Sequence, residues 1–217
     1  MKKLVIFDLD GTLVNSIEDL GEATNHALST MGYPTHPMIV YPSLVGSGVS
    51  KLLERALPEE ARRQRVIEAM KREFKAYYDE HLTDHTKVYP GIHELLDEMA
   101  GRGISMAVAS NKYQEAVSVI VSRLFPRIEW AAVMGHRDGI PVKPDPSIVF
   151  NVLLEHPTPK AETLYVGDSG IDIETARRAC VESVGVTWGF RGRSELVAAH
   201  ADHIVSDPDE ILSLLSS

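Results

Sequence analysis

The sequence predicts an α/β protein: a doubly wound, mostly parallel sheet of the Rossmann-like type, with an α-helical cap inserted after the first strand. Two patterns support this prediction. Short apolar runs alternate with helical patterns over most of the chain, whereas the stretch after the first run contains helical patterns and no convincing strand. A length of 217 residues suits one ordinary domain plus an insertion.

The apolar runs have the length of buried strands, and they end in glycine or polar turn residues. The expected strands are residues 4–7, 105–109, 130–134, 163–166, 183–187 and 202–205. The expected helices between them are residues 92–102, 113–124, 147–155, 171–179 and 194–199. Right-handed crossovers place the carboxyl ends of such strands at one edge of the sheet, where α/β proteins bind their ligands.

The alternation stops between residues 15 and 87, where helical patterns cover residues 16–31, 49–57 and 59–78. Ser16 is the expected N-cap of the first helix, and Asp19, three residues later, is the expected acid of a capping box. Pro58 separates the second pattern from the third. The predicted domains are therefore a core of residues 1–14 and 88–217 and a helical cap of residues 15–87.

Composition argues against several classes of partner. Lys and Arg number 22 and Asp and Glu 31, which gives a net charge of −9, and no long basic block indicates a nucleic-acid binder. No apolar run approaches the ~20 residues that span a membrane. The basic and then apolar start resembles a secretion signal, but Asp8 and Asp10 interrupt it too early. We therefore expect a cytoplasmic protein, a monomer or weak homodimer.

The single cysteine, Cys180, excludes an internal disulfide and suits a reducing compartment. It follows the predicted helix of residues 171–179, where we expect it to be a small buried apolar residue. Trp188 and Phe190 follow a predicted strand, and we expect them to pack against the protein interior rather than to recognise a ligand.

Two carboxylates at the end of the first predicted strand are the strongest functional signal. Asp8 and Asp10 follow the buried run of residues 4–7 and precede the turn residue Gly11. Crowding two like charges at the end of a buried strand is costly unless a partner compensates them. A metal ion, a lysine or both would do so, and the spacing therefore indicates a reactive site.

Three later segments carry polar residues suited to an anionic ligand. Ser110 and Asn111 follow the strand of residues 105–109 and precede a helix, whose N-terminus favours anions. Lys143 begins a stretch that two prolines stiffen. Asp168 and Asp172 lie four residues apart after the strand of residues 163–166, so they would project from one side of the first turn of a helix.

These four motifs, in this order over nearly the whole chain, resemble those of the haloacid dehalogenase-like superfamily and, within it, the phosphoglycolate phosphatase-like group. The resemblance implies that Asp8 attacks phosphorus and forms an aspartyl-phosphate, while Asp10 acts as general acid and then general base. It also implies a Mg²⁺ ion held by the Asp8 carboxylate, the Asp10 backbone carbonyl and the Asp168 carboxylate. Lys143 and Ser110 would hold the transferring phosphoryl group.

The remaining roles follow from the same resemblance. Asp172 would orient metal-bound water or Lys143, and Thr12 would help to shape the loop that leaves for the cap. Asn111 would join the phosphate site. Gly46 and Ser47 lie in the glycine-containing loop before the helix of residues 49–57, where they could meet a substrate carboxylate or a second phosphate.

The expected function is hydrolysis of a small phosphorylated metabolite, with 2-phosphoglycolate as the first candidate. Haloacid dehalogenases and phosphonate hydrolases of the superfamily lack the second acid that this chain has as Asp10. A sugar-phosphate mutase and an inorganic pyrophosphatase remain as alternatives within the superfamily. The alternative from a different class is a non-enzymatic phospho-receiver switch, although receivers accept phosphate on a later strand and lack a helical insertion of this size.

Overall fold

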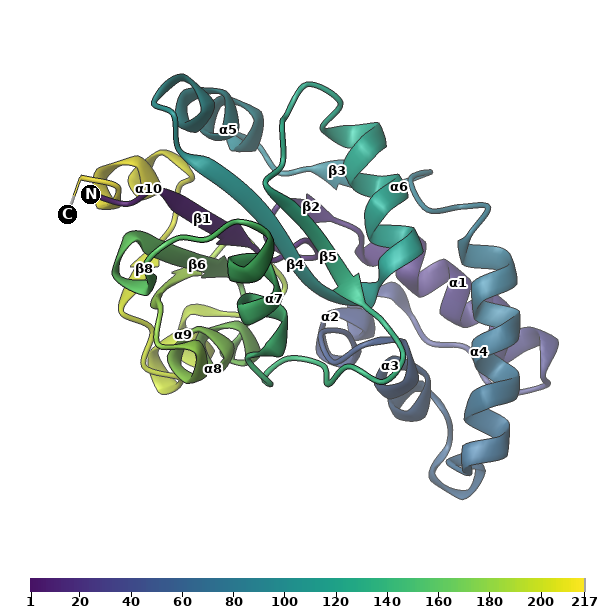
Figure 1. The fold of residues 1–217 in the computed structure, drawn as a ribbon. Coiled ribbons are helices and arrows are strands. Elements are labelled where there is room, and N and C mark those ends of the chain that lie inside the picture. The colour runs from purple at the N-terminus through teal and green to yellow at the C-terminus, as the bar shows by residue number, and fades with distance from the viewer. Residues whose placement is uncertain (217) are drawn as a thin grey trace.

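The first strand lies in the middle of a six-stranded parallel sheet, as the computed structural model of the chain shows for residues 1–216 (Figure 1). The strand order is β5-β4-β1-β6-β7-β8. Their bounds are β1 (Leu4–Phe7), β4 (Ser105–Tyr113), β5 (Ala132–His136), β6 (Thr163–Gly167), β7 (Glu182–Val186) and β8 (His203–Val205). After β5 the chain returns to the other side of β1, which creates a crevice at the carboxyl ends of β1 and β6.

Helices cover both faces of the sheet. Successive side chains of a strand point to opposite faces, and since all four residues of β1 are buried, both faces of the sheet need a cover. They are α5 (Ile92–Gly101), α6 (Gln114–Leu124), α7 (Ser147–Glu155), α8 (Gly170–Ala179), α9 (Arg193–Ala198) and α10 (Asp209–Leu214). Val5 and Phe7 of β1 belong to the apolar cluster that includes α5, α6 and α10. Leu4 and Ile6 belong to the cluster that includes α7 and α8. This confirms the predicted doubly wound α/β fold.

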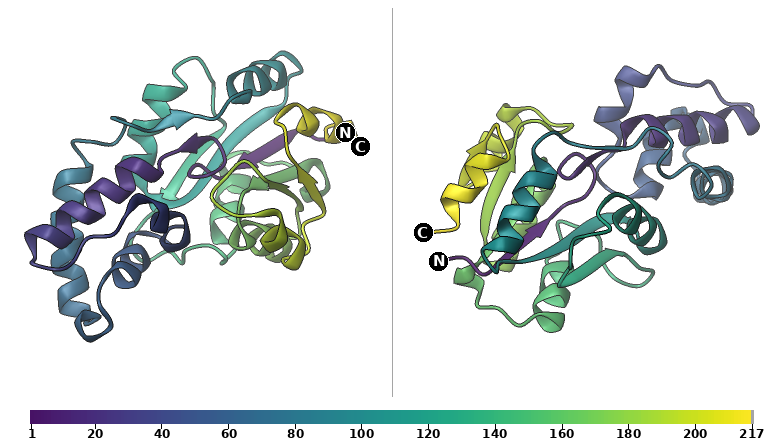
Figure 2. Two further views of the ribbon diagram at one scale, coloured as in Figure 1. Left: turned by 180° about the vertical axis from the view of Figure 1, so that it is seen from behind. Right: turned by 90° about the horizontal axis from the view of Figure 1, so that it is seen from above.

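Residues 16–86, called the helical segment below, contain α1 (Ile17–Thr30), α2 (Tyr41–Leu44), α3 (Val49–Ala56) and α4 (Gln64–Tyr78). Helices α1 and α4 bury apolar side chains such as Ala27 and Phe74 between them. The segment lies at the carboxyl end of β1, beside the sheet (Figures 1 and 2). No helix in the described part of the chain is long and apolar enough to cross a bilayer.

Two short strands that the sequence pattern did not reveal flank the helical segment. Strand β2 (Val14–Asn15) pairs antiparallel with β3 (Lys87–Val88). With two residues each, they are too short to show an alternating pattern. Helix α10 was not predicted either, and residues 59–61, expected to begin the third helix, instead form a separate 3₁₀ turn before α4.

The predicted capping box at the start of α1 is wrong. Ser16 makes no side-chain capping bond; its hydroxyl donates to Asp10 Oδ1. Asp19 instead accepts hydrogen bonds from the backbone N–H groups of His85 and Thr86, at 2.9 and 2.8 Å. The Asp19 carboxylate thus connects α1 to the segment just before β3. These hydrogen bonds, to residues far away in sequence, replace the local capping bonds.

The expectation that Cys180 is buried is also wrong, since it is exposed. It ends α8 in the left-handed conformation with φ of 57°. The residue that follows the last turn of a helix commonly adopts this conformation and turns the chain away.

Candidate active site

The strand register brings the sequence motifs to one place. Phe7 pairs with Val108 of β4 and with Val166 of β6, so the residues that follow these three positions emerge side by side at the sheet edge. Asp8 and Asp168 directly follow β1 and β6. Ser110 lies within β4, which extends past the predicted end at residue 109 to Tyr113, at the point where its pairing with β5 becomes irregular. The crevice in which they meet is the position where α/β proteins bind ligands.

Lys143 reaches this site from the loop before α7. Its ammonium nitrogen lies 3.0 Å from Asp8 Oδ1 and 2.7 Å from Asp172 Oδ1, and its side chain is almost fully buried. It also donates to the Ala109 carbonyl at 3.1 Å and the Tyr165 hydroxyl at 3.0 Å. Lys143 is therefore held at a fixed point against Asp8.

Asp8, Asp168 and Asp172 form a buried acidic cluster, with one carboxylate oxygen of each within 4.8 Å of the others. Burial raises the pKa of Asp8 to about 7, although Lys143 opposes that shift. Burial, followed by the charges of Asp172 and Asp8, raises the pKa of Asp168 well above its usual value. Among residues 1–216, Lys143 is the cation whose ammonium group contacts this cluster, at Asp8 and Asp172, so the three carboxylates outnumber their direct cationic partner.

The donor set of this cluster fits a hard divalent cation. Mg²⁺ prefers oxygen ligands, and its charge would compensate the carboxylates that Lys143 alone does not balance. Both oxygens of Asp172 are already used, Oδ1 by Lys143 and Oδ2 by the N–H and hydroxyl of Ser169 in a capping box on α8. Asp8 and Asp168 are therefore the better side-chain ligands, whereas Asp172 holds Lys143.

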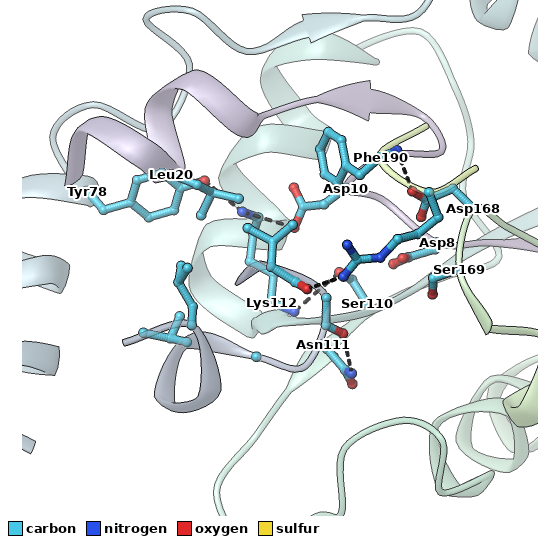
Figure 3. Close-up of a pocket in the computed structure, with 16 residues that line it drawn as sticks. Asp8, Asp10, Leu20, Tyr78, Ser110, Asn111, Lys112, Asp168, Ser169 and Phe190 are labelled. Atoms are coloured by element: carbon cyan, nitrogen blue, oxygen red, sulfur yellow. Dashed lines mark hydrogen bonds and ion pairs between the residues drawn. The ribbon is translucent and has the colours of Figure 1, made fainter. Parts of the chain in front are cut away.

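Asp8 and Asp168 line a pocket between the sheet edge and the helical segment (Figure 3). The sheet edge contributes Asp8, Asp10 and Ser110, whereas Leu20 and Val49 belong to an apolar wall from the helical segment. The volume of the cavity is about 50 Å³. That is several times the ~10–15 Å³ needed for one water and suits a small ligand.

The other predicted site residues differ in whether they line the pocket. Asn111 lines the pocket, but its side-chain amide is occupied by backbone groups. Its oxygen accepts from the backbone N–H of Lys143 at 2.8 Å, and its nitrogen donates to the backbone carbonyls of Lys143 and Gly46, both at 3.2 Å. Gly46 lines the pocket, whereas Ser47 lines a neighbouring groove and accepts from Arg55 at 3.1 Å. Thr12 is fully buried and accepts a bond from the Trp188 ring at its carbonyl.

Several residues at the pocket were not predicted from the sequence. Lys112 Nζ lies 3.1 Å from Asp10 Oδ2 and 2.6 Å from the hydroxyl of Tyr78, the last residue of α4. Arg191 donates to the carbonyls of Pro42 and Val45 in the helical segment. Lys112 directly follows the Ser110-Asn111 motif, so its place in the chain was a usable signal. Tyr78 and Arg191 carry no such signal.

The expectation for the two aromatic residues after β7 holds for Trp188 and only in part for Phe190. Both pack against the main apolar cluster. Phe190 also lines the pocket, and its backbone N–H donates to Asp168 Oδ2 at 2.7 Å. The β7–α9 loop therefore orients one of the candidate metal ligands.

We expect Gly189→Ala to destabilise the protein by about 1–3 kcal/mol, the range for overpacking a filled site. An added Cβ would lie 2.2 Å from the Gly11 carbonyl oxygen and 2.3 Å from Asp168 Cβ. The clash would also displace Asp168, a candidate metal ligand. Urea unfolding measures the stability change. Gly101→Ala is the matched control, since nothing lies within 4 Å of its added Cβ; equal midpoints for the two variants would contradict the close packing at Gly189.

Comparison with known proteins places the chain in a class of hydrolases. Residues 5–186 match the model of the haloacid dehalogenase-like hydrolases. The chain therefore belongs to the haloacid dehalogenase-like hydrolase family, which confirms the resemblance seen in the sequence motifs.

Similar proteins include phosphoglycolate phosphatases. The enzyme of Vibrio parahaemolyticus is 31% identical over 99% of this chain and 96% of its own length. That of Pseudomonas syringae pv. tomato is 30% identical over 95% of this chain and 77% of its own length. The crystal structure of a candidate phosphoglycolate phosphatase from Lactobacillus delbrueckii has a TM-score of 0.92 and 31% identity, and the match covers 99% of both chains.

Proposed function

We propose that this phosphoric monoester hydrolase releases phosphate from a small metabolite through an aspartyl-phosphate on Asp8, with Mg²⁺ as its cofactor and 2-phosphoglycolate as the first candidate substrate. The observation that carries the proposal is the buried pair of Asp8 and Lys143, 3.0 Å apart, beside Asp168 at the end of the pocket. The phosphoglycolate phosphatases among the relatives support the choice of substrate.

In the first step one oxygen of Asp8 attacks phosphorus. Lys143 and the Leu9 N–H both donate to Oδ1, at 3.0 and 2.7 Å, which leaves Oδ2 as the attacking atom. The bond between phosphorus and the leaving oxygen breaks as the Asp8–phosphorus bond forms, and Asp10 gives a proton to the departing alkoxide. Ser110 lines the pocket beside Asp8 and would donate to a phosphoryl oxygen.

In the second step water attacks the aspartyl-phosphate. Asp10, now ionised, takes a proton from the water; inorganic phosphate leaves and the Asp8 carboxylate is regenerated. Lys143 compensates negative charge in both steps. A Mg²⁺ ion, held by the carboxylates of Asp8 and Asp168 and the Asp10 backbone carbonyl, would supply further positive charge against phosphate–carboxylate repulsion.

We also propose that residues 15–87 act as a cap over a catalytic core of residues 1–14 and 88–217. The cap would exclude water during phosphoryl transfer and reopen for product release. Contacts across the pocket support this role: Arg191 of the core donates to the Val45 carbonyl at 2.8 Å, and Asn111 donates to the Gly46 carbonyl at 3.2 Å. Gly46 would then approach the substrate through its backbone, and Ser47 would contribute only after moving toward the pocket.

The test is phosphate release from a panel that includes 2-phosphoglycolate, sugar phosphates and pyrophosphate, with Mg²⁺ and with a chelator. We expect 2-phosphoglycolate to have the largest kcat/KM. Chelation should lower turnover by at least about 10²-fold, since the cation contributes several kcal/mol of charge stabilisation, and added Mg²⁺ should restore it. Undiminished turnover in the chelator would contradict the metal assignment, and a preference for a sugar phosphate or pyrophosphate would contradict the substrate assignment.

A further inference from the structure

Lys112 is a buried lysine at the leaving-group end of the pocket. Its side chain is only 3% exposed, and a lysine is rarely buried unless it is paired, as Lys112 is with Asp10. It follows Ser110 and Asn111 on β4, and its ammonium nitrogen faces Asp10, the proposed acid for the leaving oxygen. The proposed chemistry at Asp8 does not use it.

The pocket has two ends with different chemistry (Figure 3). Asp8, Asp168 and Ser169 lie together at one end, and Tyr78 and Leu20 lie at the other, with Asp10 and Lys112 between them. A phosphoryl group placed at Asp8 would therefore direct the carbon part of its ester past Asp10 toward Lys112. The wall there includes the apolar side chains of Leu20, Val49 and Leu52.

Lys112 has hydrogen-bonding capacity left for a ligand. An ammonium group has three N–H donors. One reaches the Tyr78 hydroxyl at 2.6 Å and one reaches Asp10 Oδ2 at 3.1 Å, so one remains on a side chain that lines the cavity. An anionic ligand group there would be attracted to Lys112.

Arg191, the other cationic residue lining this pocket, is already committed elsewhere. Its guanidinium donates to the backbone carbonyls of Pro42 and Val45, and its Nε lies 3.7 Å from a Glu195 carboxylate oxygen. These contacts position the chain before α3. Lys112 lies 3.1 Å from Asp10, the proposed acid for the leaving oxygen, and is therefore the better-placed cation for an anionic group on the leaving alcohol.

We propose that Lys112 is a specificity-determining residue that binds a carboxylate on the leaving-group side of the substrate. The inference rests on the proposed function and assigns to one side chain of this protein the recognition of the carboxylate that distinguishes 2-phosphoglycolate from a neutral phosphate monoester. A neutral alcohol of the same size would leave the third N–H of Lys112 without an anionic partner in a largely apolar surrounding.

The test compares two esters of similar size, 2-phosphoglycolate and ethyl phosphate, in wild type, Lys112→Met and Lys112→Arg. We expect wild type to prefer 2-phosphoglycolate in kcat/KM. Lys112→Met should reduce that preference by about 10- to 100-fold, the effect of one hydrogen bond to a charged group, mainly through KM for 2-phosphoglycolate. Lys112→Arg should restore part of it. Lys51→Met removes an exposed lysine outside this pocket and should keep the full preference.

The outcomes separate the inference from the function on which it rests. Equal losses for both esters in Lys112→Met, carried by kcat, would show that Lys112 only positions Asp10 and would overturn the inference. Wild-type turnover of both esters without preference would also overturn it, while the phosphatase proposal stands. If wild type hydrolyses neither ester, the proposed substrate class itself fails. Circular dichroism of Lys112→Met checks that the buried substitution leaves the fold intact.

Discussion

Asp8→Asn is expected to lower kcat by about 10⁶-fold, the scale seen when an essential nucleophile is removed. The amide keeps the size of the carboxylate but has no anionic oxygen to attack phosphorus. The fold should survive, because burial already raises the pKa of Asp8 to about 7 and an amide removes one charge from the acidic cluster. Phosphate release measures turnover, and thermal unfolding measures stability.

The matched control for this variant is Asp97→Asn, which removes an exposed carboxylate that does not line the pocket. Its turnover should equal that of wild type. Rapid turnover by purified Asp8→Asn, free of wild-type protein, would remove Asp8 from the role of nucleophile even if the metal and the pocket are as described.

Lys143→Met is expected to lower both stability and turnover. Removing one partner of a buried ion pair costs about 3–5 kcal/mol, because the remaining charge is left without compensation. Here the loss would leave Asp8 and Asp172 facing each other without the ammonium that lies 3.0 and 2.7 Å from them. Turnover should fall by about 10³-fold or more, the effect of losing one group that stabilises charge in the transition state. Urea unfolding and phosphate release measure the two effects.

The double variant Lys143→Met with Asp172→Asn separates the two roles of Lys143. Removing the Asp172 charge should recover part of the lost stability, since one fewer buried carboxylate then lacks a cation. Turnover should stay low, because Asp8 still lacks Lys143. Recovery of turnover in the double variant would mean that Lys143 serves the fold and not the chemistry.

The core of the fold could be predicted because its signals are local. Each strand of the main sheet contains a short apolar run, although β4 continues past its run to Tyr113, and the helices between the strands show their own periodicity. The predictions failed where distant contacts compete with local ones. Ser16 and Asp19 have the spacing of a capping box. In the structure, however, Ser16 donates to Asp10, and Asp19 accepts from the N–H groups of residues 85 and 86.

The phosphate end of the site could be read from the chain for a similar reason. Parallel strands carry Asp8, Ser110 and Asp168 to one edge, so a residue after a strand already has a predictable place. The other end depends on how the helical segment lies against the sheet. Tyr78 meets Lys112 across 34 positions in sequence, and Arg191 meets Val45 across 146. No pattern within one element encodes these distances.

The most direct test is to locate the phosphoryl group on the protein during turnover. Wild-type protein is mixed with Mg²⁺ and 2-phosphoglycolate carrying a labelled phosphoryl group, quenched in acid within a single turnover and digested for peptide mass analysis. The account predicts a labelled acyl-phosphate on the peptide of residues 4–15, at Asp8, and no label on that peptide in Asp8→Asn. Label on any other residue, or phosphate release in a single turnover with no labelled peptide, would contradict it.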